Sequence, residues 1–242
     1  MKIKTDYFKY LRYTKSLSWS KFLFEKAIPI SDFYVKSKEN KVYVRSVNHS
    51  FSPGEFPVFF EGYQKYCWRF LENGCRFAFD GNKMFVKIND LTIRVQTLEE
   101  LYILNEVFLE NVYKIESNSN YIVLDIGMNV GITSLYFSQF DNIKAIYGFE
   151  PFKPTFDCAK GNISLNGKHD SKIHVFNFGL SNADKWIDLN YDSENKGNVG
   201  IKNVGLKGKK RKVERIELKD SSKILQRIIN KHSGIKRIVK VD

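Results

Sequence analysis

The stretch that decides the fold is residues 121–140, YIVLDIGMNVGITSLYFSQF. An apolar run ends in Asp125, a loop with glycines at 127 and 131 follows, and apolar residues then recur at helical spacing. This order predicts a buried strand, a glycine-rich turn and a helix. The carboxyl ends of such strands form the crevice in which open α/β sheets bind ligands. We therefore expect Asp125 at the mouth of a ligand site.

A second apolar run, residues 145–149, ends in Glu150, about 20 residues beyond the glycine-rich loop. A carboxylate at this place can accept hydrogen bonds from both hydroxyls of a ribose. The helix that begins near Gly131 turns its free N–H groups and the positive end of its dipole toward the same place, which suits a carboxylate. Together these features predict a site for a cofactor that contains a nucleoside.

Two cofactor classes use this arrangement. A dinucleotide site requires G-x-G-x-x-G, in which the second glycine makes room for a pyrophosphate. This loop reads D-x-G-x-N-x-G, with Asn129 in place of that glycine, so an NAD-dependent oxidoreductase is disfavoured. S-adenosylmethionine has no phosphate, and Asp125 can face the ammonium of its amino-acid end. A chance combination of strand, turn and acidic residue is the remaining alternative, and the spacing of Glu150 argues against it.

Two segments, VLDIGMNVGITSLYFS (123–138) and YGFEPFKPTF (147–156), resemble the core of the FkbM-type family of S-adenosylmethionine-dependent methyltransferases. The resemblance covers about residue 83 onward, and these two motifs are its strongest part. It implies a class I methyltransferase core, S-adenosyl-L-methionine as cofactor, and O-methylation of a hydroxyl on a sugar, a glycan or a related small molecule.

The resemblance also implies a set of cofactor-binding residues. Residues 177–182, NFGLSN, are similar to the family segment that typically reads ALSD and lies beside the adenine. Asn182 replaces the acid of that segment, so a carboxylate role is lost there. Phe152 or Phe156 could face the adenine, although a core role is favoured. The expected cofactor-binding residues are Asp125, Gly127, Met128, Asn129, Gly131, Glu150, Pro151, Asn177, Phe178 and Gly179.

The C-terminal segment IKRIVKVD, residues 235–242, reads as a fourth parallel strand. It resembles the family's K-x-D-x-E-G segment as far as Lys240 and Asp242. Asp242 is the candidate catalytic residue, because a carboxylate at a strand end can position or deprotonate an acceptor hydroxyl. It could equally bind the cofactor or cap a turn. No metal site is expected.

The predicted fold is α/β, with a Rossmann-like, doubly wound, mainly parallel sheet and an N-terminal α+β extension. We place a basic helical segment and a small β-meander in residues 1–96, and the cofactor-binding core in residues 97–242. By the resemblance the core lacks its C-terminal strands, which would leave the last strand as an exposed edge. A truncated family member is the favoured interpretation, and a degenerate cofactor-binding protein is the alternative.

The N-terminal region contains several short elements. Thr97-Leu98-Glu99-Glu100 is a capping box, because Thr97 can cap the helix and Glu100 can reach back to the start of it. The helix that it begins has apolar residues on one face. Packing is the favoured role of this helix, and a lid over the cofactor is the alternative. The other expected elements are a strand at 41–45, a turn-rich linker at 49–54, a helix at 61–72, strands at 76–79, 84–88 and 91–95, and the apolar helix face of Leu98, Leu101, Leu104, Phe108 and Val112.

Composition narrows the class of protein. Of the 242 residues, 43% are hydrophobic and 15% aromatic, which argues against disorder. The three cysteines are scattered and fit neither a disulfide framework nor a metal site, which favours a reducing, cytoplasmic location. No apolar run approaches the roughly 18 residues that span a bilayer, so a soluble protein without a transmembrane segment is expected.

The formal net charge of +12 indicates attraction to an acidic partner. Residues 1–30 carry seven Lys or Arg against two acids, interleaved with aromatic residues, and residues 202–219 carry eight against two. We expect the first segment to pack its aromatic side on the protein, and the second to be a solvated loop. The alternatives are contact with an anionic membrane, a lipid-linked glycan or nucleic acid. An inactive methyltransferase-like scaffold that binds RNA or an anionic membrane is therefore the second functional hypothesis.

Overall fold

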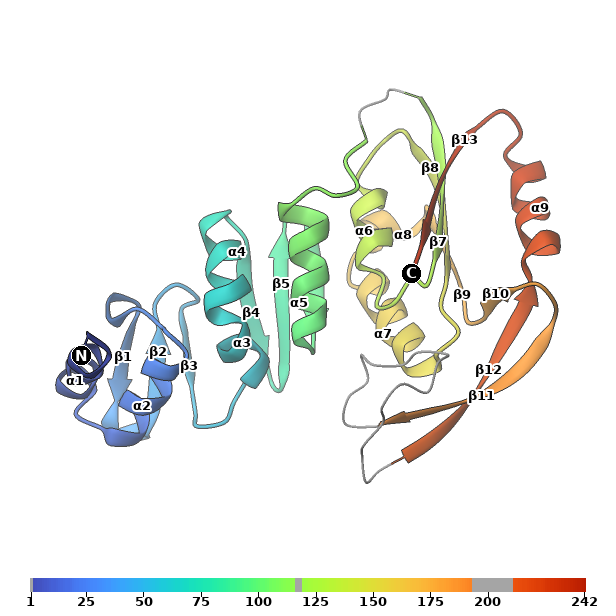
Figure 1. Cartoon of the computed structure of the whole chain (residues 1–242). Helices are drawn as coiled ribbons and strands as arrows, with labels where there is room; N and C mark the ends of the chain where they lie inside the picture. The colour runs from blue at the N-terminus through green and yellow to red at the C-terminus, as the bar shows by residue number, and fades with distance from the viewer. Residues whose placement is uncertain (1, 116–118, 193–210) are drawn as a thin grey trace. The chain divides into compact units, whose positions relative to one another are not determined.

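The computed structural model describes residues 2–115, 119–192 and 211–242 (Figure 1). The chain divides into two compact units, residues 1–110 (unit 1) and 111–242 (unit 2). The boundary of the sequence-based prediction, between residues 96 and 97, lies inside unit 1 in this division. The helix that follows residue 97 contacts helices of unit 1, which is why the unit extends beyond the predicted boundary.

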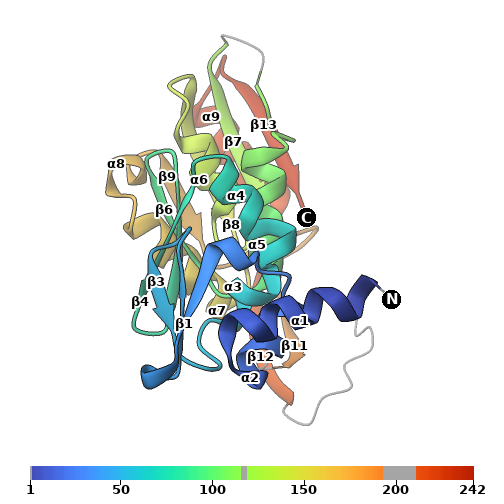
Figure 2. The same ribbon diagram turned by 90° about the vertical axis from the view of Figure 1, so that its left-hand side faces the viewer.

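Unit 1 begins with two helices and a small antiparallel sheet. The helices α1 (Lys2–Thr14) and α2 (Leu17–Glu25) lie against each other (Figure 2). The Tyr10 ring stacks on Phe33 with 5.9 Å between centroids, and its hydroxyl donates to the Ile28 carbonyl at 2.7 Å. The expected packing of the aromatic residues is therefore only partly met, because Phe8 and Tyr13 are 63% and 44% exposed. The sheet has the order β1 (Phe33–Lys36), β2 (Lys41–Val44) and β3 (His49–Phe51), with short turns η1 (Ile30–Asp32) and η2 (Ser37–Glu39) around β1.

The structure corrects two of the predicted elements. Residues 49–51 form strand β3 rather than a linker, because Phe51 is fully buried and pairs with Val42. The helix expected at 61–72 begins earlier, at Pro57, whose fixed φ suits the first helical turn. It continues as α3 (Pro57–Gly62), the π-helical turn η3 (Tyr63–Cys67) and α4 (Trp68–Glu72).

The second part of unit 1 is the predicted three-stranded meander and a capped helix. The strands are β4 (Arg76–Asp80), β5 (Lys83–Ile88) and β6 (Leu91–Val95), followed by α5 (Leu98–Leu104) and the π-helical turn η4 (Asn105–Leu109). The capping box is present, since the Glu100 N–H donates to Thr97 Oγ1 at 3.1 Å and the Glu100 carboxylate accepts from the Gln96 N–H at 2.6 Å.

The apolar face predicted for this helix is only partly correct. Leu101 and Leu104 are fully buried, whereas Leu98 is 38% and Val112 is 55% exposed. Phe108, within the π-helical turn, is 9% exposed, so the predicted face is buried from Leu101 to Phe108. Leu98 is the first residue of α5, at the end of that face. Val112 also lies beyond the end of the helix at Leu109.

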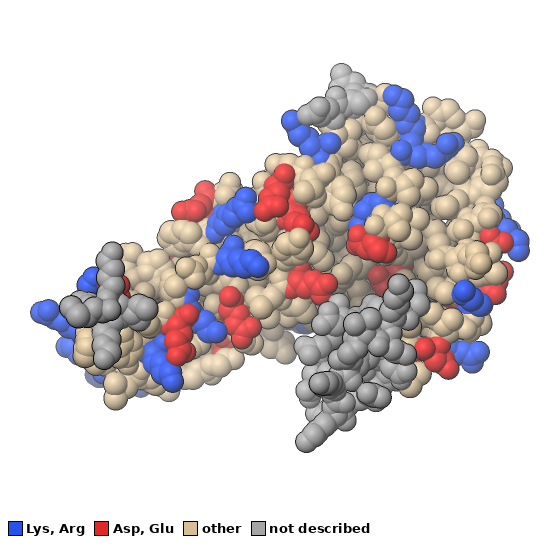
Figure 3. Space-filling model, viewed as in Figure 1, with Lys and Arg blue, Asp and Glu red and all other residues tan. Residues whose placement is uncertain are grey.

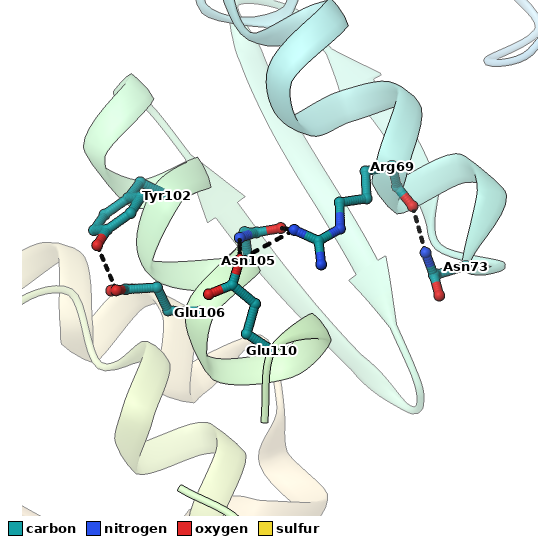
Figure 4. A network of polar contacts seen from close by, with 6 residues as sticks. All are labelled: Arg69, Asn73, Tyr102, Asn105, Glu106 and Glu110. Atoms are coloured by element: carbon teal, nitrogen blue, oxygen red, sulfur yellow. Dashed lines mark hydrogen bonds and ion pairs between the residues drawn. The ribbon is translucent and has the colours of Figure 1, made fainter. Parts of the chain in front are cut away.

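A polar network ties η4 to α4 (Figure 4). Arg69 donates to Asn105 Oδ1 at 2.9 Å and forms an ion pair with Glu110 at 3.1 Å. Asn105, which is 4% exposed, also donates to Glu110 at 2.7 Å. Arg69 and Glu110 supply the hydrogen bonds that the buried Asn105 amide would otherwise make with water. The network therefore holds the π-helical turn η4 against α4.

Unit 2 is built on a parallel four-stranded sheet in the order β13-β7-β8-β9. Helices α6 (Ile132–Ser138), α7 (Lys153–Ser164) and α8 (Gly167–Asp170) cover one face of the sheet, and α9 (Ser221–Lys231) covers the other (Figure 1). This mixed α/β arrangement is compatible with the predicted Rossmann-like fold. The strands are β7 (Tyr121–Ile126), β8 (Ile143–Phe149), β9 (Ile173–Phe176) and β13 (Lys236–Val241).

A second sheet extends unit 2, in the order β10 (Gly179–Ser181), β12 (Arg211–Asp220) and β11 (Lys185–Asp192). The prediction of a basic loop is therefore wrong for residues 211–219, which belong to strand β12. Ile216 and Leu218 alternate with polar residues and are buried, and this period-two pattern defines a strand. The rest of the predicted loop, residues 202–210, lies outside the described residues, and with it part of the predicted basic cluster.

The outer edge of the main sheet is strand β13. Among the described strands it pairs with β7 alone, and Val239 and Val241 are 56% and 65% exposed. This is the exposed edge expected from the sequence. None of the helices in the described ranges combines the length and apolar character needed to cross a bilayer. On the face drawn in Figure 3, the Lys and Arg side chains of unit 1 are interspersed with Asp and Glu rather than gathered into one patch.

The buried carboxylate of Glu100 leads to a test of stability. Burial raises the pKa of Glu100 to about 7, although the Gln96 and Thr97 N–H groups lower it. Since the folded state keeps a proton that the unfolded state has lost, this carboxyl stabilises below about pH 4.5 and loses that contribution as pH rises to about 7. Between pH 5 and pH 8, the unfolding free energy of the parent should therefore decrease because of this group. We expect this decrease to be about 3 kcal/mol smaller in Glu100→Gln, measured by urea denaturation at both pH values. An unchanged pH slope in the variant would contradict this.

Candidate functional site

The carboxyl ends of β7 and β8 hold the loop of residues 127–131. The two strands pair in parallel up to Ile126 and Phe149. The N–H groups of Gly127 and Met128 both donate to the Phe149 carbonyl at 3.0 Å, which fixes the start of the loop on the neighbouring strand. Gly127 has φ +76°, and a Cβ there would lie 3.2 Å from Asp242 Cβ. Both facts require glycine at this position.

Asp125 lies at the end of β7, as predicted, but beneath the mouth of the site rather than in it. Its side chain is fully buried, and Ser134 donates to Oδ2 at 2.7 Å. Oδ1 lies 3.1 Å from Lys240 Nζ, paired by charge rather than by an aligned hydrogen bond. Burial raises the pKa of Asp125, and the Lys240 ammonium opposes that rise.

Lys240, on β13, joins the strand ends to the loop. It is 7% exposed, and its ammonium donates to the Gly127 carbonyl at 2.6 Å and contacts Asp242 Oδ2 at 2.5 Å. Burial lowers the pKa of Lys240, but the carboxylates of Asp125 and Asp242 outweigh burial and leave the pKa above its ordinary value. The ammonium therefore stays protonated, and it has three oxygen partners.

Asp242 follows the last residue of β13. Its backbone N–H donates to the Ile126 carbonyl at 3.1 Å, which continues the pairing with β7. Its side chain is 60% exposed, while one oxygen is held by Lys240. A carboxylate that is fixed at one oxygen and open to solvent at the other can contact a ligand above the loop.

Glu150 holds the other side of the loop. Its Oε2 accepts from the Asn129 N–H at 3.0 Å, and its Oε1 accepts from the Phe152 N–H at 2.9 Å. The residue is 8% exposed, and burial raises the pKa of the carboxyl. Asn177 bridges to the same corner, because its amide donates to the Glu150 carbonyl at 2.9 Å and to the Pro151 carbonyl at 3.2 Å.

The other residues assigned from the sequence shape the site from below. Met128 is 2% exposed and packs with Phe156 and Ala159, and its sulfur lies against Gly148. Gly131, with φ +82°, caps α6 and lies close to Ala159. These positions support the loop through packing.

The segment expected beside the adenine lies next to Glu150 and Pro151. Phe178 contacts the Phe149 ring with 5.7 Å between centroids, and a Cβ at Gly179 would lie 3.3 Å from Pro151. Phe152 and Phe156 are 3% and 8% exposed, which agrees with the favoured core role. The structure therefore brings Asp125, Asn129, Glu150 and Asp242 to one edge of the sheet.

Lys240 and Ser134 belong to this site and were not assigned from the sequence. Ser134 lies one turn into α6, where its hydroxyl reaches back under the loop to Asp125. Lys240 precedes Asp242 by two residues, and in a strand this spacing places both on the same face. That spacing is the signal that could have identified Lys240.

The charges of the site favour a cation. Among the described residues, this edge of the sheet has three carboxyl groups, those of Asp125, Glu150 and Asp242, and one ammonium, that of Lys240. Because carboxylates attract a positive ligand and repel a negative one, this edge suits a cationic cofactor better than a pyrophosphate. Asn129, with φ +52°, also keeps a side chain where a dinucleotide loop has glycine.

Comparisons with known proteins give partial, distant relatives. The chain is 31% identical over 96 residues, 38% of its length, to the AMB antimetabolite synthetase AmbE of Pseudomonas aeruginosa. It is 30% identical over 105 residues, 43% of its length, to the methyltransferase sdnD of Sordaria araneosa. The matched regions span 4% and 40% of the lengths of these two relatives. Neither match covers half of this chain or half of the relative. No protein-family model matches the chain, and no solved structure matches it.

The ion pair of Lys240 and Asp125 can be tested by a mutant cycle. Lys240→Met leaves a fully buried carboxyl without its charge partner, and we expect a loss of about 3–5 kcal/mol in unfolding free energy at pH 8. Lys240→Met with Asp125→Asn removes both charges and should recover most of that loss, measured by urea denaturation. If the loss of unfolding free energy in the double variant equals the sum of the losses in the two single variants, the two side chains are not coupled, and the buried pair does not provide this stability.

Proposed function

We propose that the chain is an S-adenosylmethionine-dependent O-methyltransferase of the FkbM type, acting on a hydroxyl of a sugar, a glycan or a related small molecule. The observation that carries the proposal is the clamped loop between two strand ends, with the Glu150 carboxylate bonded to Asn129 on one side and Lys240 bonded to Gly127 on the other. The similarity to a methyltransferase, sdnD, supports the same reaction class.

The residues present fit the ribose and the charge of this cofactor. Each Glu150 oxygen accepts one backbone N–H, and a carboxylate oxygen has two lone pairs. One lone pair on each oxygen is therefore available to a ribose hydroxyl. The excess of carboxylates over ammonium suits a sulfonium and an α-ammonium. Pro151, Asn177, Phe178 and Gly179 would border the adenine.

Asp125 acts in this proposal as a positioning residue. Its buried carboxylate faces the Lys240 ammonium, so it orders the loop through Lys240 and Ser134 rather than by touching the cofactor. This differs from the expectation that Asp125 faces the cofactor ammonium. Asn129 and Gly127 then present the exposed backbone of the loop, while Met128 and Gly131 anchor it.

Asp242 is the proposed catalytic residue. When bound, S-adenosylmethionine supplies a methyl group on a sulfonium. Asp242 hydrogen-bonds the acceptor hydroxyl and takes its proton, and Lys240 keeps the carboxylate beside Gly127. Orientation of the acceptor is then the main contribution of the chain to the rate, because in-line transfer depends on alignment.

The cofactor site is tested by isothermal titration of the full chain with S-adenosylhomocysteine. Glu150→Gln removes the charge that a ribose hydroxyl would contact and keeps the size of the side chain. We expect its affinity to fall tenfold or more, corresponding to about 1.5–3 kcal/mol for a charge-assisted hydrogen bond. Glu39→Gln, an exposed residue of η2 in unit 1, is the matched control and should bind as the parent does.

Two outcomes would count against the proposal. Equal affinity in the parent and in Glu150→Gln would remove Glu150 from the site. A folded parent chain that binds no S-adenosylhomocysteine would contradict cofactor-dependent methyl transfer, and the scaffold hypothesis would then be tested by salt-dependent binding to RNA and to anionic vesicles.

A further inference from the structure

The helices α1 and α2 form a hairpin, residues 2–25, whose inner side is anchored to unit 1 (Figure 2). On α1, the Tyr10 ring stacks on Phe33 with 5.9 Å between centroids. On α2, Trp19 is 5% exposed, and its indole N–H donates to Asn40 Oδ1 at 3.1 Å. These contacts fix which side of each helix faces unit 1, so the opposite side of the hairpin is turned outward.

Two large apolar side chains lie on this outer side. Phe8, on α1, is 63% exposed, and Leu17, the first residue of α2, is 71% exposed. Leu17 has the largest exposed fraction of all the large hydrophobic side chains in the described ranges. Tyr13 is also exposed, but its hydroxyl donates to the Phe33 carbonyl at 3.1 Å and ties the ring to the sheet. Phe8 and Leu17 are therefore the side chains that project from the hairpin.

The turn between the two helices holds Leu17 in a defined place. The buried Thr14 hydroxyl accepts from the Ser16 N–H at 3.1 Å. Ser16 in turn caps α2, because its hydroxyl accepts from the Trp19 N–H at 3.4 Å. An ordered turn thus presents an apolar side chain to the solvent, next to the exposed Lys15.

Exposed cations accompany both apolar side chains. Arg12 follows Phe8 by four residues, and Lys21 follows Leu17 by four, so each cation is a neighbour on the same helix face. Within the described part of the chain, no ion pair involves Arg12, Lys15 or Lys21. Residues 6–26 carry five Lys or Arg against two acidic residues, so the hairpin has an excess of positive charge.

This combination matches the boundary between lipid and water. Single exposed apolar side chains are common on protein surfaces, but here each has an exposed cation one helical turn away. At an anionic membrane, Lys and Arg attract the acidic headgroups, while apolar side chains enter the boundary between headgroups and acyl chains. The charge of the hairpin is therefore complementary to such a surface, and its two apolar side chains gain by leaving water.

Other acidic partners fit less well. Nucleic acid would attract the cations, but an exposed leucine gains little from phosphates and sugars. A folded protein partner would need a continuous apolar patch at the centre of the interface. Along the hairpin, Arg12 and Lys15 lie between Phe8 and Leu17. Lipids can surround each apolar side chain separately, so this spacing does not hinder binding to a membrane.

We propose that the outer side of the α1–α2 hairpin docks on an anionic membrane surface. Phe8 and Leu17 enter the boundary region, and Arg12, Lys15 and Lys21 contact acidic headgroups. The hairpin lies on the membrane, since neither helix is long and apolar enough to cross it. This docking goes beyond the proposed methyl transfer and does not depend on it.

The test is co-sedimentation of the full chain with two kinds of vesicle, phosphatidylcholine alone and phosphatidylcholine with phosphatidylserine. We expect the anionic vesicles to bind about tenfold or more tightly, and added salt to weaken this binding. Phe8→Ser with Leu17→Ser should weaken binding to anionic vesicles about tenfold or more and leave the salt dependence in place. Both side chains are exposed, so the double variant keeps the packing of the hairpin.

Matched controls separate the hairpin from general surface effects. Val213→Ser, at an exposed position of β12 in unit 2, should bind vesicles as the parent does. Arg12→Gln should lower the affinity for anionic vesicles about fivefold, because one headgroup contact is lost. Arg227→Gln, at an exposed position of α9, should leave it unchanged.

A fluorescence measurement distinguishes insertion from attraction by charge alone. In Phe8→Trp and in Leu17→Trp, the added indole should emit at shorter wavelength when anionic vesicles are present, in comparison with the parent. Absence of this shift at saturating vesicle concentration would overturn the proposal. So would equal binding to both kinds of vesicle or to neither, unchanged binding in the double serine variant, or tighter binding to RNA than to anionic vesicles at the same salt concentration.

Discussion

The ion pair between Lys240 and Asp125 is the interaction on which the strand-end site depends. Burying two charges costs several kcal/mol for each ion, and the cost is offset only when further hydrogen bonds accompany the pair. Lys240 has two such partners, the Gly127 carbonyl and Asp242, and Asp125 has the Ser134 hydroxyl. The pair therefore joins β7, β13, the loop and α6 at a single point.

The loop of residues 127–131 is held by hydrogen bonds from two sides. Lys240 holds its first carbonyl from β13, and Glu150 holds the N–H of Asn129 from β8. A backbone fixed at both ends loses little further freedom when a ligand binds, which favours affinity.

Much of the fold could be predicted from local patterns, and the failures have physical causes. Strands β7 and β8 appear as apolar runs, because both of their faces are covered, whereas the edge strand β13 mixes Lys and Arg with exposed valines. Strand β12 was hidden by its charges, since only Ile216 and Leu218 mark its buried side. The positions of Asp125 and Glu150 at strand ends follow from the sequence alone. The burial of Asp125 does not, because its partner comes from a strand that only the tertiary fold brings beside it.

Lys240 and Gly127 are 113 residues apart in the sequence, and their contact has a consequence for the order of folding. Contacts between distant segments form late, since the chain must first close a long loop. Without β13 in place, the glycine-rich loop would be held only from the side of Glu150. Docking of the outermost strand and the ligand affinity of the loop are therefore thermodynamically linked, so a ligand that requires the finished loop also fastens the edge of the sheet.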